Sequence, residues 1–211
     1  MKLYDVHNEY SKGHLDKTEL TSSPFELAER WIADATRHHD IEEANKMVLA
    51  TVDPNGQPFQ RVVLLKEITS KHLVFFTNYH SRKGQHIASN NQVSLLFFWS
   101  SLERQIHFTG RATPLSHEQS ETYFHSRPYA SQLAAAASHQ SHPIANKQVL
   151  LDKVEQLKQQ YPEQIPMPCE WGGYNVSYDS VEFWQGGEHR LHDRFIYQLK
   201  EAVWEITQLA P

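Results

Sequence analysis

Cysteine is almost missing from this chain of 211 residues, since Cys169 is the single one and no intrachain disulfide can form. Long apolar runs are missing as well, because no stretch approaches the ~20 residues needed to span a bilayer. The first ten residues, MKLYDVHNEY, lack the apolar segment of a secretory signal. These absences predict a cytoplasmic protein that does not act at a membrane.

An excess of positive charge is also lacking. The formal net charge is -5 and the pI is near 6.3, so the chain has no general attraction to nucleic acid or to anionic lipid. P-loop, G-x-G-x-x-G and serine nucleophile-elbow motifs are absent, which leaves kinase and hydrolase functions without sequence support. The hydrophobic content of 39% is typical of a globular protein. Because the net charge is negative, any site that binds an anion must be a local cluster of positive charge.

The order of sequence patterns predicts an α+β fold. Ser23, Pro24 and Glu26 are typical of a capping box at the start of a helix. β-rich runs lie at 47–52, 59–68, 72–78, 93–99 and 104–115, and again at 174–185, 194–199 and 203–209. Helical patterns lie at 81–90, 117–127, 130–139 and 144–161, and Ser116 with Gln119 predicts a second capping box.

Five strands in succession indicate a mostly antiparallel sheet or barrel, interrupted by a helical insertion. We expect a single domain over 1–211. Its parts are a polar arm (1–22) that becomes ordered only against another surface, a helix with the first strands (23–115), the insertion (116–170) and the C-terminal strands (171–211).

The segment EFWQGGEHRLHDR, residues 182–194, combines two arginines, two histidines and three carboxylates with aromatic residues and a Gly-Gly pair. Arg190 and Arg194 are fixed cations suited to anions, and His192 can donate, accept or titrate near neutral pH. A metal site at Glu188, His189 and His192 is disfavoured because both arginines would repel a cation and the glycines argue against a helix. The segment is therefore predicted to be a site in a hairpin connection.

For three further groups of residues, the sequence is compatible with either a binding role or a purely structural role. Arg61 and Lys66 flank the apolar run VVLL, which suggests a strand buried on both faces, although solvated strand charges are equally compatible. Residues 81–84, SRKG, lie at a strand-to-helix junction where a phosphate could bind. Tyr123, Arg127 and Ser131 share one face at four-residue spacing, either as a surface stripe or as a phosphomonoester site, although Pro128 predicts a break.

Six motifs, in order along nearly the whole chain, resemble the pyridoxine/pyridoxamine 5'-phosphate oxidase family. They are RVVLLK (61–66), FFTN (75–78), SRK (81–83), LERQ (102–105), YFHSRP (123–128) and EFWQGGEHRLHDR (182–194). The resemblance implies an FMN-binding split β-barrel. It also implies a homodimer whose two active sites are shared between the subunits.

The resemblance further implies roles for individual residues. Cofactor contacts are expected from Arg61, Val62, Val63, Leu64, Leu65, Lys66, Phe76, Thr77, Arg82, Lys83, Gln105, Gln140, Ser141, Trp184 and Arg194. Substrate contacts are expected from His7, Asn8, Glu9, Tyr10, Lys66, Tyr123, Arg127, Ser131, Arg190, Leu191 and His192, of which Arg190 and His192 are the catalytic candidates. No metal is expected.

The sequence departs from the family pattern at two places. The arm carries His7-Asn8 where the family often has arginine, and Phe76 stands where a tyrosine is common. The first departure leaves the contribution of the arm to substrate binding open. The second is tolerable if residue 76 offers its backbone to FMN.

The resemblance implies oxidation of pyridoxine or pyridoxamine 5'-phosphate by dioxygen to pyridoxal 5'-phosphate and hydrogen peroxide, with ammonia released from the amine. Two alternatives are a split-barrel flavin reductase and a noncatalytic binder of phosphorylated ligands. A reductase would have no need of Tyr123, Arg127 and Ser131 together with Arg190 and His192, and a binder would not need a flavin pocket. The preference between amine and alcohol, product feedback and the roles of Glu188 and His189 are not fixed by the sequence.

Overall fold

The computed structural model describes residues 1, 4 and 9–211. Within these residues, nine strands form one sheet in which every pair is antiparallel. They are β1 (Lys46–Val52), β2 (Pro58–Leu64), β3 (Glu67–Ile68), β4 (His72–Asn78), β5 (Gln92–Trp99), β6 (Arg104–Pro114), β7 (Trp171–Gln185), β8 (Asp193–Lys200) and β9 (Val203–Leu209).

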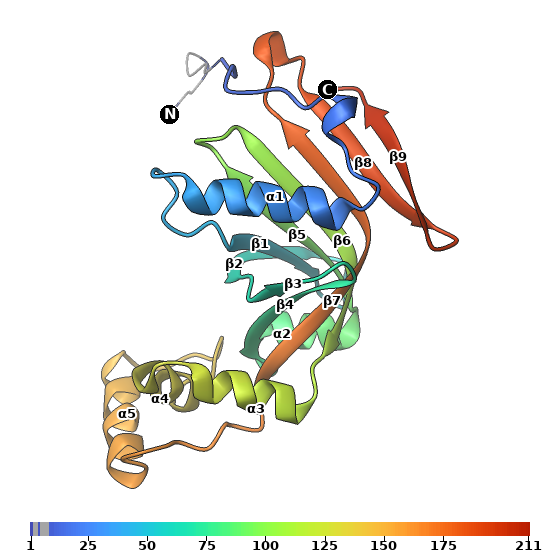
Figure 1. The fold of residues 1–211 in the computed structure, drawn as a ribbon. Helices are drawn as coiled ribbons and strands as arrows, with labels where there is room; N and C mark the ends of the chain where they lie inside the picture. The colour runs from blue at the N-terminus through green and yellow to red at the C-terminus, as the bar shows by residue number, and fades with distance from the viewer. Residues whose placement is uncertain (2–3, 5–8) are drawn as a thin grey trace.

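Helices cover the sheet and extend from one end of it. They are α1 (Pro24–Arg37), α2 (Arg82–Ser89), α3 (His117–Ser126), α4 (Tyr129–Ala137) and α5 (Gln148–Gln160), with short 3-10 helices η1 (Lys17–Glu19) and η2 (Glu188–Arg190). Figure 1 shows α1 across one face of the curled sheet and α3, α4 and α5 gathered at one end. The predicted α+β architecture with a helical insertion is confirmed. Among the described residues, no helix is long and apolar enough to cross a membrane.

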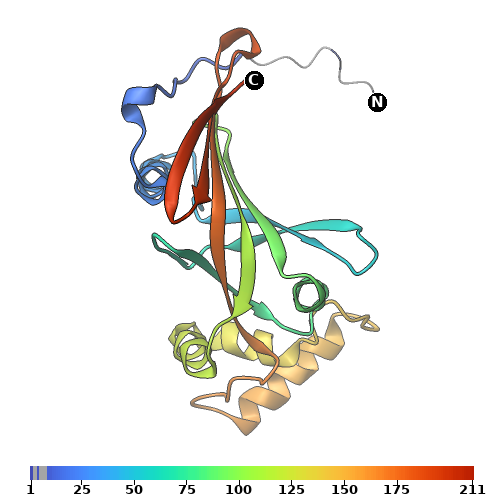
Figure 2. The same ribbon diagram turned by 90° about the vertical axis from the view of Figure 1, so that its right-hand side faces the viewer.

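Strand β7 is the strand that connects the two parts of the sheet, because it pairs with three other strands. It pairs with β6 along almost its whole length, with β4 through residues 171–177, and with β8 through residues 180–185. The sheet order is β2-β1-β5-β6-β7-β4-β3, and β8 and β9 continue from the second half of β7. Figure 2 shows the long strands running between the helical end and the end that carries the β7–β8 connection.

Strand β2 differs from its prediction. The predicted strand 59–68 is broken at Leu65 and Lys66, because the N–H of Leu65 donates to Asn45 O (2.9 Å) whereas that of Lys66 donates to Val74 O (2.8 Å). The chain thus leaves its pairing with β1 and begins to pair with β4. Burial on both faces was also wrong, since β2 lies at an edge of the sheet and Val62 is 59% exposed.

Helix boundaries follow local chemistry, with one correction. The capping box at Ser116 and Gln119 is confirmed, and α3 ends before Pro128 as predicted. The box predicted at Ser23 and Glu26 is not formed, because the Ser23 hydroxyl accepts from the Phe25 N–H instead. Two predicted helices are shorter than expected: 130–139 corresponds to α4, which ends at 137, and 144–161 to α5, which begins at 148.

Two hydrophobic clusters hold the molecule together. The larger one lies between α1 and the sheet, where Trp31 packs edge-on against Phe183 with ring centroids 5.3 Å apart. The smaller one joins the helical insertion to the first residue of β7 and consists of Phe124, Leu133, Ile165 and Trp171 with partly buried neighbours. The helical insertion therefore packs against the start of β7.

Replacing Gly110 with alanine should destabilise the fold. The register of β6 against β7 shifts between Thr109 and Gly110, and a Cβ at residue 110 would overlap the Ser177 carbonyl oxygen. Gly110→Ala should lower the free energy of unfolding by about 1–3 kcal/mol, measured by urea denaturation. Thr113→Ala, at an exposed position of β6, is the control and should change it by about 0.5 kcal/mol or less. Equal effects of the two substitutions would contradict this account of the bulge.

Candidate functional site

A cavity of about 640 Å³ lies between the strands β2 and β4 and the helical insertion. Eleven of the residues predicted to bind cofactor or substrate line it: Val62, Val63, Leu64, Lys66, Phe76, Thr77, Lys83, Tyr123, Arg127, Ser131 and Gln140. Leu65 is buried beside this set, and Ser141 is exposed with a left-handed φ of 72°. The cavity therefore collects predictions made from four separate sequence motifs.

Lys83 is held at the centre of a group of polar side chains. Its Nζ lies 2.8 Å from Gln140 Oε1, 3.1 Å from Thr77 Oγ1 and 3.3 Å from Ser81 Oγ. Burial, reinforced by the charge of Arg61, lowers the pKa of Lys83 to about 8. An anion bound beside this ammonium group would reverse part of that shift.

Two arginines complete a cluster of positive charge next to Lys83. Arg61 on β2 donates from Nη1 to Thr51 Oγ1 (2.7 Å) and to Leu49 O (3.2 Å). Its pKa is lowered by burial and by the nearby charge of Arg82. Arg82 begins α2 and lies over the ring of Phe59, with 5.5 Å from Cζ to the centroid. Three cations at a helix N-terminus form a suitable site for a phosphate.

The cavity is also lined by a second set of groups suited to a phosphate. Arg127 stacks over Trp171 (4.9 Å from Cζ to the centroid) and donates from Nη2 to Ser131 O (3.0 Å). Its Nη1 is buried without a hydrogen-bond partner among the described residues, so the guanidinium retains donor capacity. Lys66 Nζ lies 5.9 Å from the centroid of the Tyr123 ring. The single helical face predicted for Tyr123, Arg127 and Ser131 is replaced by two helices, yet all three residues line the cavity.

An aromatic stack lines the cavity. Phe76 stacks on Tyr123 with centroids 3.8 Å apart and on Trp171 with centroids 5.5 Å apart. Trp171 was not predicted to belong to the site. No charge pattern surrounds it in the sequence, and its role becomes visible only when β7 and α3 are packed together.

A second cavity, of about 430 Å³, contains Gln105, Trp184 and Arg194. The guanidinium of Arg194 is fixed on both sides: Nε and Nη2 each lie 2.8 Å from Glu182 Oε1, and Nη1 donates to Ala210 O (2.9 Å). Glu182 lies in the segment predicted to be a site, but no individual role was predicted for it. Strand alternation could have indicated it, because it shares a sheet face with Trp184.

His107 lies on the same face and was also missed. It stands opposite Glu182 in the β6–β7 register, and its Nε2 lies 2.6 Å from Ser94 Oγ. Burial lowers the pKa of His107, which favours the neutral ring. The second cavity therefore combines a neutral imidazole with a fixed Glu–Arg pair.

The hairpin between β7 and β8 presents Arg190, Leu191 and His192. Arg190 is exposed with a left-handed φ of 64°, and Leu191 is 71% exposed. His192 Nδ1 accepts a hydrogen bond from the Gly187 N–H (3.1 Å), so Nε2 carries the proton when the ring is neutral. A Cβ on Gly187 would overlap the Leu191 carbonyl oxygen, which explains why glycine is needed in this tight connection.

The N-terminal arm docks against this hairpin. Tyr10 contacts both Trp184 and His192 edge-on, each with centroids 5.6 Å apart. Glu9 Oε2 accepts from the His189 N–H (3.3 Å), which gives a structural contact to a residue whose role the sequence left open. The predicted substrate residues His7 and Asn8 lie outside the described residues.

Two buried or partly buried carboxylates tether the arm further along. The Lys12 N–H donates to Glu103 Oε2 and the Leu15 N–H donates to Asp193 Oδ2, each at 2.9 Å. Leu15 is itself buried, at 4% exposure. Between residues 9 and 22 the arm contacts the hairpin, the β5–β6 connection and β8 of its own chain.

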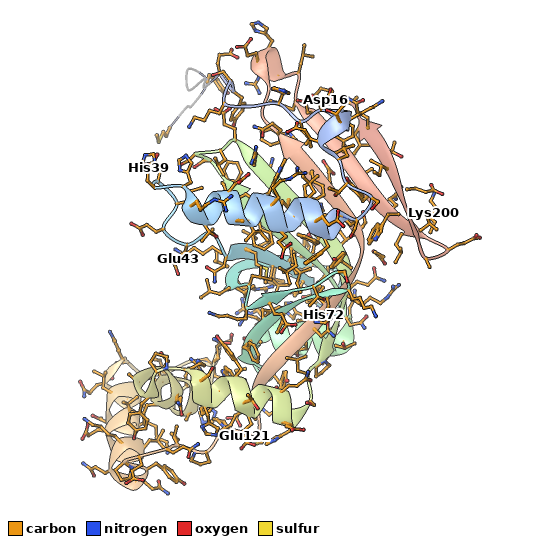
Figure 3. All side chains as sticks on the ribbon, viewed as in Figure 1. Asp16, His39, Glu43, His72, Glu121 and Lys200 are labelled. Carbon is orange, nitrogen blue, oxygen red and sulfur yellow. The ribbon has the colours of Figure 1, made fainter. Side chains whose placement is uncertain are left out.

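The predicted residues fall into two groups. Trp171 borders the first cavity and Trp184 the second, and a fully extended strand, rising about 3.3 Å per residue, would place these two residues of β7 at most roughly 40 Å apart. The cavities themselves approach each other at β2, where Gln60 lines the second and Val62 the first. In Figure 3, Glu121 on α3 lies at the helical end, whereas Asp16 of the arm lies near the hairpin. One chain therefore does not bring Arg190 and His192 together with Tyr123, Arg127 and Ser131.

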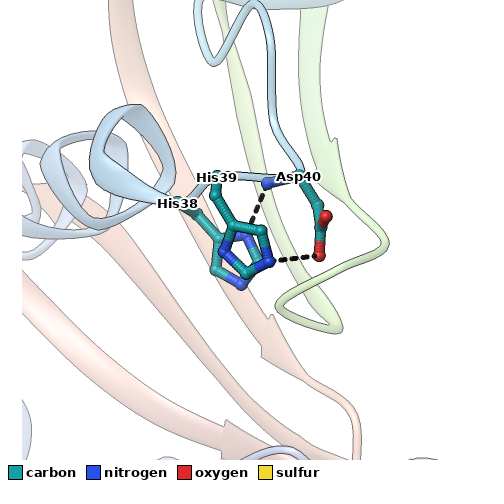
Figure 4. A group of neighbouring side chains, drawn as sticks. All are labelled: His38, His39 and Asp40. Carbon is teal, nitrogen blue, oxygen red and sulfur yellow. Dashed lines mark hydrogen bonds and ion pairs between the residues drawn. The ribbon is translucent and has the colours of Figure 1, made fainter.

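The structure gives no support for a metal at the hairpin, because His192 Nδ1 already accepts from the backbone. Among the described residues, the grouping with suitable ligand atoms is His38, His39 and Asp40. Figure 4 shows this group just after α1, where His39 Nε2 lies 3.3 Å from Asp40 Oδ2. None of the three lines either cavity, and His39 and Asp40 are exposed.

Comparison with known proteins links these features to one family. Residues 34–161 match the model described as "Pyridoxamine 5'-phosphate oxidase", and residues 171–211 match "Pyridoxine 5'-phosphate oxidase C-terminal dimerisation region". The pyridoxine/pyridoxamine 5'-phosphate oxidase of Shewanella pealeana is 50% identical over 98% of this chain and 97% of its own. The protein of the same name from Proteus mirabilis is 51% identical over 98% and 95%.

Solved structures agree on the fold. PhzG from Burkholderia lata, determined in complex with tetrahydrophenazine-1-carboxylic acid, has a TM-score of 0.87 and 28% identity over 93% of this chain and 98% of its own. A pyridoxamine 5'-phosphate oxidase-related, FMN-binding protein from Nostoc punctiforme has a TM-score of 0.71 and 17% identity over 91% and 100%, and is similar in fold alone. These similarities confirm the expected split-barrel fold class.

Affinity for a phosphomonoester should depend on the protonation of Lys83. Its pKa is lowered to about 8, so the ammonium is charged below this pH and loses its proton above it. The association constant measured by titration calorimetry should therefore fall as pH rises above about 8, while the arginines stay charged.

Lys83→Met should bind more weakly and should not show this alkaline fall. Lys71→Met, at an exposed position before β4, should behave like the unmodified protein. An alkaline fall that persists in Lys83→Met would show that another group titrates.

Proposed function

Because the chain belongs to the pyridoxine/pyridoxamine 5'-phosphate oxidase family, we propose that it oxidises pyridoxine 5'-phosphate and pyridoxamine 5'-phosphate to pyridoxal 5'-phosphate. Dioxygen is the electron acceptor and becomes hydrogen peroxide. The alcohol loses two electrons and two protons, and the amine additionally consumes water and releases ammonia. The chain contributes binding groups and electrostatics to a reaction whose redox chemistry belongs to FMN.

The observation that carries this proposal is the presence of two separate sets of groups suited to phosphates. Arg61, Arg82 and Lys83 form one set with Thr77 and Gln140, and Lys66, Tyr123, Arg127 and Ser131 form the other. The first set reaches the cavity through Thr77, Lys83 and Gln140, and its two arginines lie beside the cavity. A cofactor phosphate and a substrate phosphate would each need several cations and hydrogen-bond donors. A protein that binds a single phosphorylated ligand would have no use for both.

The first set fits the phosphate end of FMN. Lys83 and Thr77 already converge on Gln140 Oε1, and burial, with the charge of a neighbouring arginine, lowers the pKa values of Lys83 and Arg61. Val62 to Leu65 and Phe76 would border the ribityl chain and ring, with Ser141 nearby. When bound, FMN would accept a hydride from the carbon of the substrate's 4-substituent and be reoxidised by dioxygen.

The second set fits the phosphate of the substrate. Arg127 has a buried Nη1 without a partner among the described residues, and it is held rigidly over Trp171. Burial lowers the pKa of Arg127, but arginine stays protonated at physiological pH. Lys66 and the Tyr123 hydroxyl would add a second cation and a donor.

The rest of the site would come from a second copy of the chain. Gln105, Trp184 and Arg194 would contact the flavin of the neighbouring subunit, and Arg190, Leu191 and His192 would contact its substrate. The hairpin residues Arg190, Leu191 and His192 do not line the cavity that contains Tyr123, Arg127 and Ser131, which supports this arrangement. The match of residues 171–211 to a C-terminal dimerisation region supports it independently.

Arg190 and His192 would act on the pyridine ring of the substrate. Arg190 is exposed on a tight turn, where it can extend over a ring held by the partner subunit. His192 would present Nε2–H as a hydrogen-bond donor, because the Gly187 N–H occupies Nδ1. Glu9 and Tyr10, packed on the same hairpin, would cover the site from the arm.

Purified protein tests the proposal directly. It should be yellow, or become yellow with FMN, and should form pyridoxal 5'-phosphate only when dioxygen is present. A protein that binds FMN but reduces a second flavin without forming the aldehyde would be a flavin reductase. A protein that takes up no FMN would end the oxidase proposal.

Replacing Arg190 with methionine should impair substrate use and leave the cofactor in place. We expect KM for pyridoxine 5'-phosphate to rise about 10-fold or more and kcat to fall, because a charge-assisted contact to the ring is lost. The FMN content, measured by absorbance, should match that of the unmodified enzyme. Arg37→Met, an exposed change on α1, is the control. Unchanged kcat/KM in Arg190→Met would exclude this role.

A further inference from the structure

Two buried polar side chains lie directly behind the cation cluster and have no role in the site described above. Thr51 on β1 is 1% exposed and His86 on α2 is 6% exposed. Thr51 Oγ1 lies 2.7 Å from Arg61 Nη1 and 3.1 Å from His86 Nδ1. The three residues form a continuous chain of hydrogen bonds from the helix to the guanidinium.

The chemistry of the three groups gives this chain a direction. A guanidinium can only donate, so the Thr51 oxygen must accept from Arg61. The Thr51 hydroxyl can then donate its single proton to His86 Nδ1, provided that this nitrogen is unprotonated. In that state a lone pair of the Thr51 oxygen faces Arg61. Arg61 Nη1 also donates to the Leu49 carbonyl oxygen, and this second hydrogen bond holds the guanidinium against β1.

We propose that Thr51 and His86 are positioning residues that orient Arg61 toward the phosphate of FMN, and that this orientation requires a neutral His86. The proposal rests on the proposed function, since it assigns a support to the cofactor site. Neither residue touches the phosphate. Both act through Arg61.

The surroundings of His86 favour the neutral ring. Burial lowers its pKa first, and the charges of Arg61 on β2 and Arg82 on α2 lower it further, while Asp53 after β1 raises it. The ring of Phe59 packs against the imidazole with centroids 5.0 Å apart. Protonation would turn Nδ1 into a donor, remove the acceptor for the Thr51 hydroxyl and place a third cation beside the two arginines.

Substitutions at Thr51 test the hydrogen bond. Thr51→Val has nearly the same shape and lacks the hydroxyl, so the dissociation constant of FMN at pH 7.5, measured by quenching of flavin fluorescence, should rise about 5–20-fold. Thr51→Ser restores the hydroxyl and should bind within about 2-fold of the unmodified protein. Rescue by serine separates the hydrogen bond from a packing effect, because serine is the smaller and less well-packed residue.

Substitutions at His86 test the requirement for a neutral acceptor. His86→Gln offers an amide oxygen that does not titrate, so it should bind FMN nearly as well as the unmodified protein at pH 7.5. Between pH 7.5 and 5.5 its affinity should fall less than that of the unmodified protein. The FMN phosphate, with a second pKa of about 6, titrates in both proteins and cancels in the comparison. His86→Phe, without an acceptor, should bind weakly at both pH values.

His72→Gln on β4 is the matched control and should keep the pH profile of the unmodified protein. Identical dissociation constants and pH profiles in the Thr51 and His86 variants would overturn this inference alone, with the oxidase assignment intact. An unmodified protein that binds no FMN at any pH would overturn the proposed function, and the inference with it.

Discussion

The register of β7 with its neighbours is the constraint on which the rest of the structure depends. This strand pairs with β4 through its first half and with β8 through its second half, so its two ends belong to different parts of the molecule. Trp171 at one end packs under Arg127, and Trp184 at the other end packs against Tyr10 and His192. A continuous strand cannot bring its own ends together. Under the proposed function one reaction uses both ends, and a second copy of the chain would supply one of them.

Local electrostatics explains how an acidic protein could bind the two phosphates of the proposed function. The net charge of -5 provides no general attraction, but Arg61, Arg82 and Lys83 meet where β2 and the start of α2 converge. Burial, and secondly the charge of a neighbouring arginine, lowers the pKa of Lys83 and of Arg61, and a bound anion would favour their charged forms. A ligand that binds only the folded state also stabilises that state. The cofactor would therefore contribute to stability as well as to chemistry.

The sequence predicted most elements correctly because alternation, capping residues and Pro128 act locally. The prediction of one strand over 59–68 failed because pairing with distant residues decides where that strand ends. Leu65 and Lys66 lie outside β2, and their N–H groups donate to the carbonyl oxygens of Asn45 and Val74. Motifs that resemble the family predicted most of the lining of the larger cavity. Trp171 and His107 were missed, and Glu182 received no individual role, since each becomes part of a cavity only through β-strand pairing or packing against the insertion. The assigned roles of the site residues stay predictions.

Activity of a mixed dimer tests the shared site most directly. Arg127→Met would damage the substrate-phosphate end of a site and Arg190→Met the hairpin end, so each homodimer should be nearly inactive. A heterodimer of the two variants, isolated with two different affinity tags, would contain one intact site if the two residues come from different subunits. The account predicts that it regains about half of the wild-type activity. A heterodimer as inactive as its parents would show that both residues serve the site of one chain.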